Sequence, residues 1–301
     1  MLNKIAENNT NIICDSADLF SSTKASINGN GFVNENWANR NLKVGIREFA
    51  MGTISNGIAL YGGLIPIQST FMVFSDYLKN ALRLSAMMDL KVISAFTHDS
   101  IAVGEDGATH QCCEQLAGLR SIPNCTVFRP ANLNETIAAY ASALSGHGPT
   151  VLALSRQTLK EFQGSIQDAM KGGYIVAKEN RNTLDAIIIA TGSEVSIALD
   201  VKTNLQNMGY NIRVVSMPSM EKFEQQSEKY KNDILPKDIK SIFSIEAGNT
   251  AMWYKYTGRY GKCFGVDQFG DSGTPQDMYN KFGLTAENIT KEIVKVIKEN
   301  K

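Results

Sequence analysis

Polar side chains that could carry out chemistry follow several predicted strands in the first half of the chain. Residues 15–18 follow the first predicted strand, residues 47–48 the second, and residues 155–157 the last. The segment at 97–110 follows another strand and holds two of the three histidines in the chain. Ligands of open parallel sheets bind outside the carboxyl ends of the strands, so we expect these groups to meet at one sheet edge. Carboxylates, imidazoles and a guanidinium gathered there could bind a phosphorylated ligand and move protons.

Each of these residues also has an ordinary structural explanation. Glu48 at a helix start could complement the helix dipole, and Asp18 in a post-strand turn could be a cap residue. His98 could be a buried structural histidine, and Arg156 could form a surface ion pair of little energetic weight. Their coincidence at successive strand ends favours a functional site over four separate structural roles.

Three aromatic residues, Phe71, Phe74 and Tyr77, recur at intervals of three, which is ordinary spacing for a helix face in a core. The glycine-containing segment at 269–273 is typical of a turn, because nothing downstream of it makes a phosphate-binding loop. No cluster of residues has the spacing of a zinc or calcium site, so the sequence predicts no metal ligands in this chain.

The polar groups depend on strands that alternate with amphipathic stretches. That alternation predicts a mainly parallel sheet with helices on both faces. The strands are expected at 11–14, 42–46, 91–96, 125–128 and 150–154, and the helices near 47–60, 74–89, 111–122 and 134–144.

A second α/β pattern follows a stretch rich in Gln, Gly and charged residues. Its strands are expected at 186–190, 212–216, 241–245 and 263–266, with helices over 193–208 and from about residue 285. The fold class is therefore α/β, with two domains that are each a mainly parallel sheet flanked by helices. We place the first domain at 1–160, a linker at 161–182 and the second domain at 183–301.

Composition excludes several classes of function. The chain has 301 residues, 43% of them hydrophobic, and its 30 basic residues balance 30 acidic ones. This balance gives no electrostatic reason to expect nucleic acid or a membrane surface as a partner. The N-terminus has no signal-peptide pattern, and the five cysteines form no CxxC pair. We expect free thiols in a cytoplasmic protein.

Ordered motifs across nearly the whole chain resemble those of the transketolase family. The first half carries residues 16–19 (SADL), 45–52 (GIREFAMG), 69–77 (STFMVFSDY), 97–101 (THDSI), 104–111 (GEDGATHQ), 128–131 (FRPA) and 154–157 (LSRQ). The second half carries residues 190–195 (ATGSEV), 215–219 (VSMPS), 244–247 (SIEA) and 265–270 (GVDQFG). The resemblance implies the pyrimidine-binding domain of that family followed by its C-terminal domain.

The resemblance implies thiamine diphosphate as the cofactor, held between two domain types. Glu48 would bond the ring nitrogen of the aminopyrimidine. The positions matching the rest of the cofactor pocket are Asp18, Leu19, Phe71, Phe74 and Tyr77.

The resemblance also implies the substrate contacts. Arg156 and His98 would hold a sugar phosphate, Asp106 a sugar hydroxyl, and His110 the reacting carbonyl or hydroxyl. Ser22 matches a further substrate position. The catalytic positions would be Glu48, His98 and His110.

The chain departs from the family pattern inside the substrate loop and upstream of it. Ala102 stands where the family usually has Gly, and Ala108 and Cys112 stand where it has Pro. Residues 105–107 with Asn132 loosely resemble the family's metal motif but lack its leading Gly, so no metal is assigned here. The domain that binds Mg²⁺ or Ca²⁺ and the diphosphate has no counterpart. We expect a diphosphate-binding partner subunit or domain, and hence a split-enzyme subunit or a C-terminal fragment.

The expected activity is ketol transfer between sugar phosphates in the pentose phosphate pathway, in a homodimer of this chain or a heterotetramer with its partner. The alternatives are a non-catalytic binding or assembly module and a related enzyme, such as 1-deoxyxylulose-5-phosphate synthase or the β subunit of a 2-oxo-acid dehydrogenase. The loop from His98 to His110 and Arg156 favour sugar-phosphate transfer.

Overall fold

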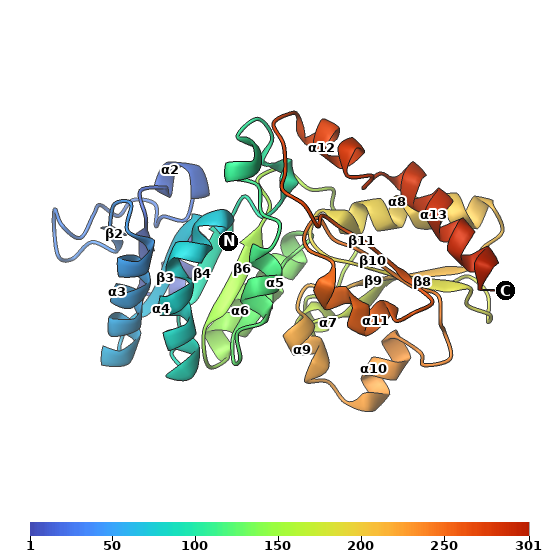
Figure 1. Cartoon of the computed structure of the whole chain (residues 1–301). Coiled ribbons are helices and arrows are strands. Elements are labelled where there is room, and N and C mark those ends of the chain that lie inside the picture. The colour runs from blue at the N-terminus through green and yellow to red at the C-terminus, as the bar shows by residue number, and fades with distance from the viewer. Residues whose placement is uncertain (301) are drawn as a thin grey trace.

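The computed structural model describes residues 1–300 as two α/β units that lie side by side (Figure 1). The first unit is built on a six-stranded, fully parallel sheet with the order β2-β1-β3-β4-β6-β5. Its strands are β1 (Ile12–Ser16), β2 (Asn41–Lys43), β3 (Ile65–Phe71), β4 (Ile93–Thr97), β5 (Thr126–Phe128) and β6 (Thr150–Leu154).

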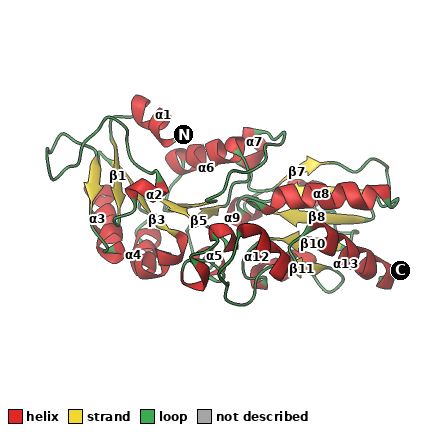
Figure 2. Cartoon of the chain, turned by 90° about the horizontal axis from the view of Figure 1, so that it is seen from above, coloured by secondary structure: helices red, strands yellow, loops and turns green. Residues whose placement is uncertain are grey.

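Helices cover both faces of the first sheet, as the view from above shows (Figure 2). They are α1 (Leu2–Asn8), α2 (Phe20–Thr23), α3 (Glu48–Tyr61), α4 (Ser75–Met87), α5 (Gln115–Arg120) and α6 (Leu133–Ser145). Met51, Leu78 and Leu119 of α3, α4 and α5 pack with strand residues on one face. Leu2 of α1 and Tyr140 of α6 lie in the core on the other face. Burial on both faces explains the near-continuous apolar character of these strands.

The second unit is a five-stranded sheet with the order β11-β10-β8-β9-β7. Its strands are β7 (Tyr174–Ala177), β8 (Ala186–Ala190), β9 (Ile212–Ser216), β10 (Ile242–Ile245) and β11 (Lys262–Phe264). The helices of this half are α7 (Ile166–Ala169), α8 (Glu194–Asn207), α9 (Met220–Glu224), α10 (Glu228–Ile234), α11 (Tyr254–Thr257), α12 (Pro275–Lys281) and α13 (Ala286–Glu299). The expected α/β class with two sheets is confirmed.

The last helix shows how the sequence specifies these elements. Thr285 caps α13 by accepting a hydrogen bond from the backbone of Asn288. Ile289, Ile293 and Ile297 recur every four residues and are buried against the second sheet. The apolar stripe therefore docks the helix while its lysines face outward. Within residues 1–300, no helix is long and apolar enough to cross a membrane.

Three segments differ from the sequence-based expectations. Residues 161–182, expected as a linker, contain α7 and β7, and β7 pairs antiparallel with β9 at the sheet edge. The strand is an apolar run of only four residues, and the glycines and charged residues around it have the composition of a linker. Strand β3 was absent from the expected set because Pro66 and polar residues interrupt its apolar pattern. Helix α5 starts at Gln115 rather than residue 111, because the preceding residues bond to the second unit.

Candidate active site at the carboxyl edge of the first sheet

A cavity of about 480 Å³ opens at the carboxyl edge of the first sheet. It lies where β1 ends and α3 begins, and most of its wall is apolar. Its lining residues are Ala17, Asp18, Leu19, Ile46, Glu48, Phe74 and Tyr77. Asp18 is exposed and adopts a left-handed backbone conformation with φ of 66°, which turns the chain sharply after β1. The cavity brings together Asp18 and Glu48, which the strand-end rule predicts at one edge, and Leu19, which the family resemblance adds.

Glu48 is the buried acidic group of this cavity. It occupies the first turn of α3 with only 7% of its surface exposed. Its carboxylate has no hydrogen bond or ion pair with any other part of residues 1–300. Close packing of α3 against α4 fixes its position, since a Cβ at Gly52 would lie 2.6 Å from the Ala81 Cβ. Because Glu48 lines the cavity, a ligand bound there could supply the partner that its carboxylate lacks.

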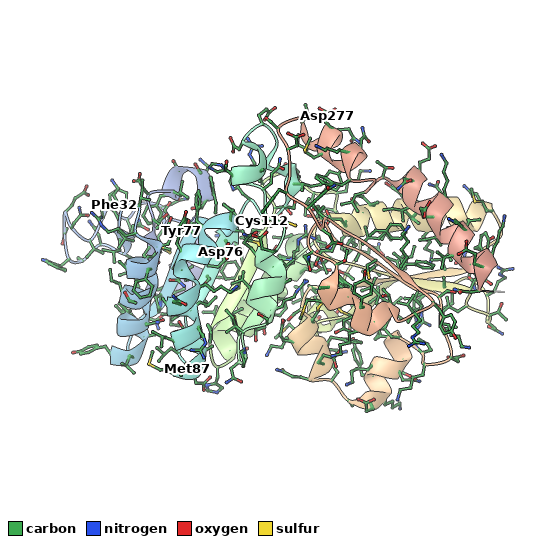
Figure 3. The ribbon with its side chains drawn as sticks, in the orientation of Figure 1. Phe32, Asp76, Tyr77, Met87, Cys112 and Asp277 are labelled. Carbon is green, nitrogen blue, oxygen red and sulfur yellow. The ribbon has the colours of Figure 1, made fainter. Side chains whose placement is uncertain are left out.

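The three aromatic residues stand on different elements rather than on one helix face. Phe71 ends β3, Phe74 closes the 3₁₀ turn at Met72–Phe74, and Tyr77 lies in α4. Successive ring centroids lie 5.9 Å and 6.3 Å apart. Phe74 and the 67% exposed Tyr77 line the cavity, and the buried Phe71 stacks on Phe74, so the set forms an aromatic wall and not a helix core. Figure 3 labels Tyr77 on α4.

His98 connects this wall to the polar loop. It follows β4, is 7% exposed, and has a left-handed backbone with φ of 62°. Its Nδ1 lies 2.8 Å from the hydroxyl of Thr97. Burial lowers the pKa of His98 to about 4, and the charge of Arg156 acts in the same direction. The imidazole is therefore neutral at physiological pH and can both donate and accept a hydrogen bond.

The other predicted substrate residues surround His98 and the aromatic wall. His110 is half-buried, with its Nδ1 2.9 Å from the Thr109 hydroxyl and its ring edge-on to Phe74 at 5.5 Å. Asp106 and Arg156 are exposed and act electrostatically on His98. Ser22 is exposed on α2, the helix directly after Leu19. The structure joins all these residues to one edge, although Ser22 makes no side-chain hydrogen bond within residues 1–300.

Sequence reasoning gave no role to a buried charge network between the two units. Arg129 donates from Nε to Asp99 at 2.8 Å and from Nη1 to the Thr191 carbonyl and Glu194. Next to it, Arg120 donates to both carboxylate oxygens of Glu246 at 2.8 Å. Asp99 directly follows His98, so the network reaches the edge of the site. Its residues lie within the noted motifs, but their pairing spans distant parts of the sequence.

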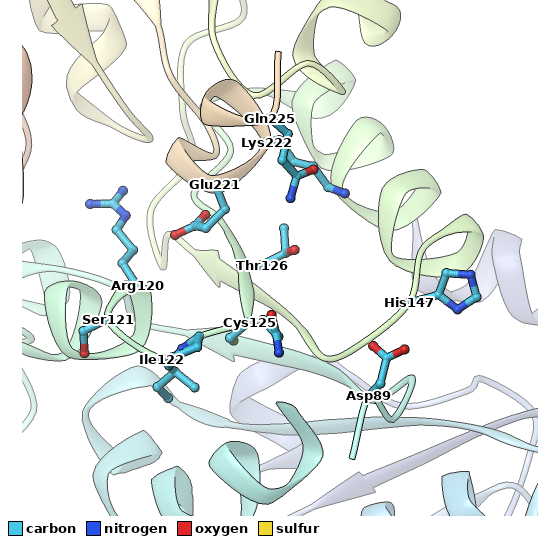
Figure 4. A pocket seen from close by; sticks show the side chains of 12 residues that line it. Asp89, Arg120, Ser121, Ile122, Cys125, Thr126, His147, Glu221, Lys222 and Gln225 are labelled. Carbon is cyan, nitrogen blue, oxygen red and sulfur yellow. The ribbon is translucent and has the colours of Figure 1, made fainter. Parts of the chain in front are cut away.

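A second hollow of about 480 Å³ lies between the units at the amino edge of the first sheet (Figure 4). Acidic residues Asp89 and Glu221 and basic residues His147 and Lys222 line it together. This mixed charge favours no single class of ligand. Among residues 1–300, no group of three or more His, Cys, Asp or Glu side chains could hold a metal ion.

Comparisons with known proteins identify both halves. Residues 1–161 match the family described as transketolase, pyrimidine binding domain, and residues 172–285 match the transketolase-like TK C-terminal domain. A transketolase of Bacillus subtilis is 44% identical over 303 residues, covering 99% of this chain and 45% of that protein. A probable transketolase of Streptococcus pneumoniae is 46% identical over 294 residues, covering 97% and 45%.

Solved structures agree with the sequence matches. Transketolase from Pichia stipitis in complex with sedoheptulose 7-phosphate superposes with a TM-score of 0.94 at 40% identity, covering 99% of this chain and 44% of that one. A split-gene transketolase described as an inactive β4 tetramer superposes with a TM-score of 0.79 at 25% identity, covering 99% and 95%. The chain spans about half the length of the curated relatives it matches. From the pyrimidine-domain match over more than half of its residues, this chain belongs to the transketolase family.

Proposed function

We propose that this chain is the pyrimidine-binding and C-terminal half of a transketolase. With a diphosphate-binding partner, it transfers a two-carbon ketol unit from a ketose phosphate to an aldose phosphate. The observation that carries this proposal is Glu48, a buried residue whose carboxylate has no protein partner among residues 1–300 and lines an apolar cavity beside Phe74 and Tyr77.

The cavity fits the pyrimidine end of thiamine diphosphate, the cofactor of this family. An aromatic wall suits a planar heterocycle, and a carboxyl group that lacks a partner suits a ring nitrogen. Phe71, Phe74 and Tyr77 would hold the ring, while Asp18 and Leu19 line its approach. When bound, the cofactor supplies the nucleophilic carbon and the electron sink for carbon–carbon cleavage. Glu48 would hold the proton that the ring nitrogen shares.

The polar side chains around His98 would bind the phosphate and the hydroxyl groups of a sugar phosphate. Arg156 would pair with the phosphate, and the neutral His98 would donate one further hydrogen bond to it. Asp106 would accept a hydrogen bond from a sugar hydroxyl. His110 lies between these side chains and the aromatic wall, which is the place for a group that bonds the reacting carbonyl or hydroxyl. Ser22 would add a contact at the rim of the cavity.

An exposed apolar face supports the need for a partner. It comprises Ile46, Phe49, Leu60, Tyr61, Tyr77 and Met87, of which Tyr61 is 95% and Ile46 79% exposed. Tyr77 and Met87 lie along α4 (Figure 3), and Ile46 and Tyr77 also line the cavity. Apolar faces of this kind mark interaction sites. We place the diphosphate-binding subunit or domain there, so that the cofactor is enclosed between it and this chain.

The remaining assignments follow from this placement. The partner would bind Mg²⁺ or Ca²⁺ with the diphosphate, and the assembly would be a heterotetramer or contain a homodimer of this chain. The split-gene relative, described as an inactive β4 tetramer, supports a subunit that needs a partner. We expect the first domain over 1–160 and a role in the cytoplasmic pentose phosphate pathway. The second domain, expected over 183–301, would begin before residue 183, because β7 is part of its sheet.

A coupled ketol-transfer assay tests the proposal. The chain would be assayed with a ketose phosphate, ribose 5-phosphate, thiamine diphosphate and Mg²⁺, first alone and then with a diphosphate-binding transketolase subunit. Activity only in the mixture is the expected result. A well-folded mixture in which the two proteins associate without turnover would favour the non-catalytic assembly module. Turnover of pyruvate with glyceraldehyde 3-phosphate instead would favour 1-deoxyxylulose-5-phosphate synthase.

A further inference from the structure

Segments from both units meet at the loop that carries Asp106 and His110. This loop runs from Gly104 to Cys113 and holds only one short 3₁₀ turn, at Gly107–Thr109. The strand-to-helix segment before α12 belongs to the second unit and passes directly beside it (Figure 1). Turn hydrogen bonds such as His110 N–H to the Gly107 carbonyl shape the middle of the loop, and bonds to the neighbouring segment of the second unit fix its position.

Gln111 makes the central contact between these two segments. Its side chain is 3% exposed, and its amide nitrogen donates to the Asp271 carbonyl at 2.8 Å and to the Gly104 carbonyl at 3.0 Å. Its amide oxygen accepts a hydrogen bond from the Asp271 backbone at 3.0 Å. Both amide protons and the oxygen of Gln111 are therefore hydrogen-bonded. Two of the three bonds go to Asp271 of the second unit, and the third goes to Gly104 across the base of the loop.

The second unit is shaped to receive this amide. A Cβ at Gly270 would lie 1.7 Å from the Gln111 oxygen, so a residue with a side chain cannot occupy this position without moving the contact. The Ser272 hydroxyl donates to the Glu105 carbonyl at 2.7 Å. At the far end of the loop, Cys113 donates to the Val266 carbonyl at 2.9 Å. Contacts with the second unit thus bracket Asp106 and His110.

We propose that Gln111 is a positioning residue. Through it, the second unit holds the loop at residues 104–113 in the conformation in which Asp106 and His110 can bind the substrate. The second unit then acts on substrate binding without touching the substrate. This effect on substrate binding rests on the proposed function, because it assumes that Asp106 and His110 hold the sugar. The contact of Gln111 with Asp271 and Gly104 (the Gln111 clip) lies within this chain, so it can be measured on the chain without a partner.

The test is Gln111→Glu, which keeps the size of the side chain but replaces the donating nitrogen with a second oxygen. Near neutral pH the carboxylate would face the Gly104 and Asp271 carbonyls without a proton to donate. Gln276→Glu makes the same change at an exposed position of α12 and serves as the control. Ser272→Ala removes one bond of the same contact and provides a milder variant if Gln111→Glu folds poorly.

Hydrogen exchange of the chain alone gives the first readout. We expect Gln111→Glu to lower the protection of the Gly107, His110 and Asp271 amides by about tenfold or more, with the strands of both sheets unchanged. After correction for intrinsic exchange rates, protection should recover in part at about pH 5, where a buried carboxyl regains one proton and can donate to one of the two carbonyls. Unchanged loop protection would overturn the proposal. An equal loss of amide protection along the whole boundary between the units would also overturn it, because Gln111 would then only help to dock the two units.

The assembled enzyme gives the second readout. There, Gln111→Glu should raise the KM for the ketose phosphate by about tenfold and change the affinity for thiamine diphosphate little. An unchanged KM in an active complex would contradict a positioning role. If the wild-type mixture shows no ketol transfer, the proposed function fails, while the exchange experiment still decides whether the clip exists.

Discussion

The imidazole of His98 stacks on the phenyl ring of Phe71, with the two ring centroids 3.8 Å apart. Phe71 ends β3 and His98 follows β4, and these strands are neighbours in the sheet. The contact joins the apolar wall of the cavity to the polar loop. It also removes water from one face of the imidazole, and burial is the main cause of the lowered pKa of His98.

Replacing Phe71 with Ala should therefore raise the pKa of His98. In the wild type, the His98 resonance should titrate near pH 4 and stay that of a neutral ring above about pH 5. In Phe71→Ala, water reaches the ring and the midpoint should move toward the ordinary value of 6.5. Histidine-labelled NMR measures this, with His98→Gln to assign the signal. A midpoint that stays near 4 would show that Phe71 does not shield the ring.

Asp15 should make stability fall as pH rises. This carboxyl of β1 is 1% exposed, accepts a hydrogen bond from Ser55 at 2.6 Å, and has one oxygen without a partner among residues 1–300. Burial raises its pKa from 3.8 to about 7. The stabilisation from its protonated form is complete below pH 3.8 and is lost as pH rises through about 7. Asn cannot ionise, so Asp15→Asn should be more stable than the wild type at about pH 8, by roughly 1–3 kcal/mol.

Urea unfolding at low and high pH measures the Asp15 effect. The gain should be near zero at about pH 4 and largest at about pH 8. Asp238→Asn, at an exposed position, controls for the loss of a negative charge. If Asp15→Asn keeps the pH dependence of the wild type, the carboxyl does not titrate as its burial implies.

Arg129 should be essential for stability at the boundary between the units. Its side chain is fully buried and pairs with Asp99 and Glu194. Arg129→Leu would leave two buried carboxylates without a counter-charge, which should cost about 3–5 kcal/mol of unfolding free energy. Chemical unfolding measures the loss. Lys291→Leu removes an exposed ion pair with Glu287 and should leave the unfolding free energy nearly unchanged. A similar small effect at Arg129 would mean that the buried network contributes little.

The fold was predictable where periodicity and burial agree. The apolar strand Ala186–Ala190 and the amphipathic helix α13 occur where their patterns place them. Strand β3 was missed because a buried strand that lines a site carries polar residues such as Gln68. The apolar run at residues 174–177 gave no clear strand signal, because it is only four residues long and stands between two glycines and a polar, charged stretch.

The site was predictable because parallel strands bring their carboxyl ends to one edge. That rule, with the family motifs, gathered Asp18, Glu48, His98 and Arg156 before any geometry was known. The contacts that stiffen the site were not predictable. Gln111 bonds to Asp271 across 160 residues, and Arg129 bonds to Glu194 across 65. Local pattern contains no signal for such pairs, since only the docking of two complete sheets brings them together.

The substitution Glu48→Gln in the assembled complex tests the central claim most directly. Gln keeps the size of the side chain but cannot hold a proton for a ring nitrogen. We expect turnover to fall by about a hundredfold or more, with the partner and thiamine diphosphate still bound. Glu161→Gln, at an exposed position, should be fully active. Near-normal turnover of Glu48→Gln would contradict the assignment of Glu48 and the account of the cavity that depends on it.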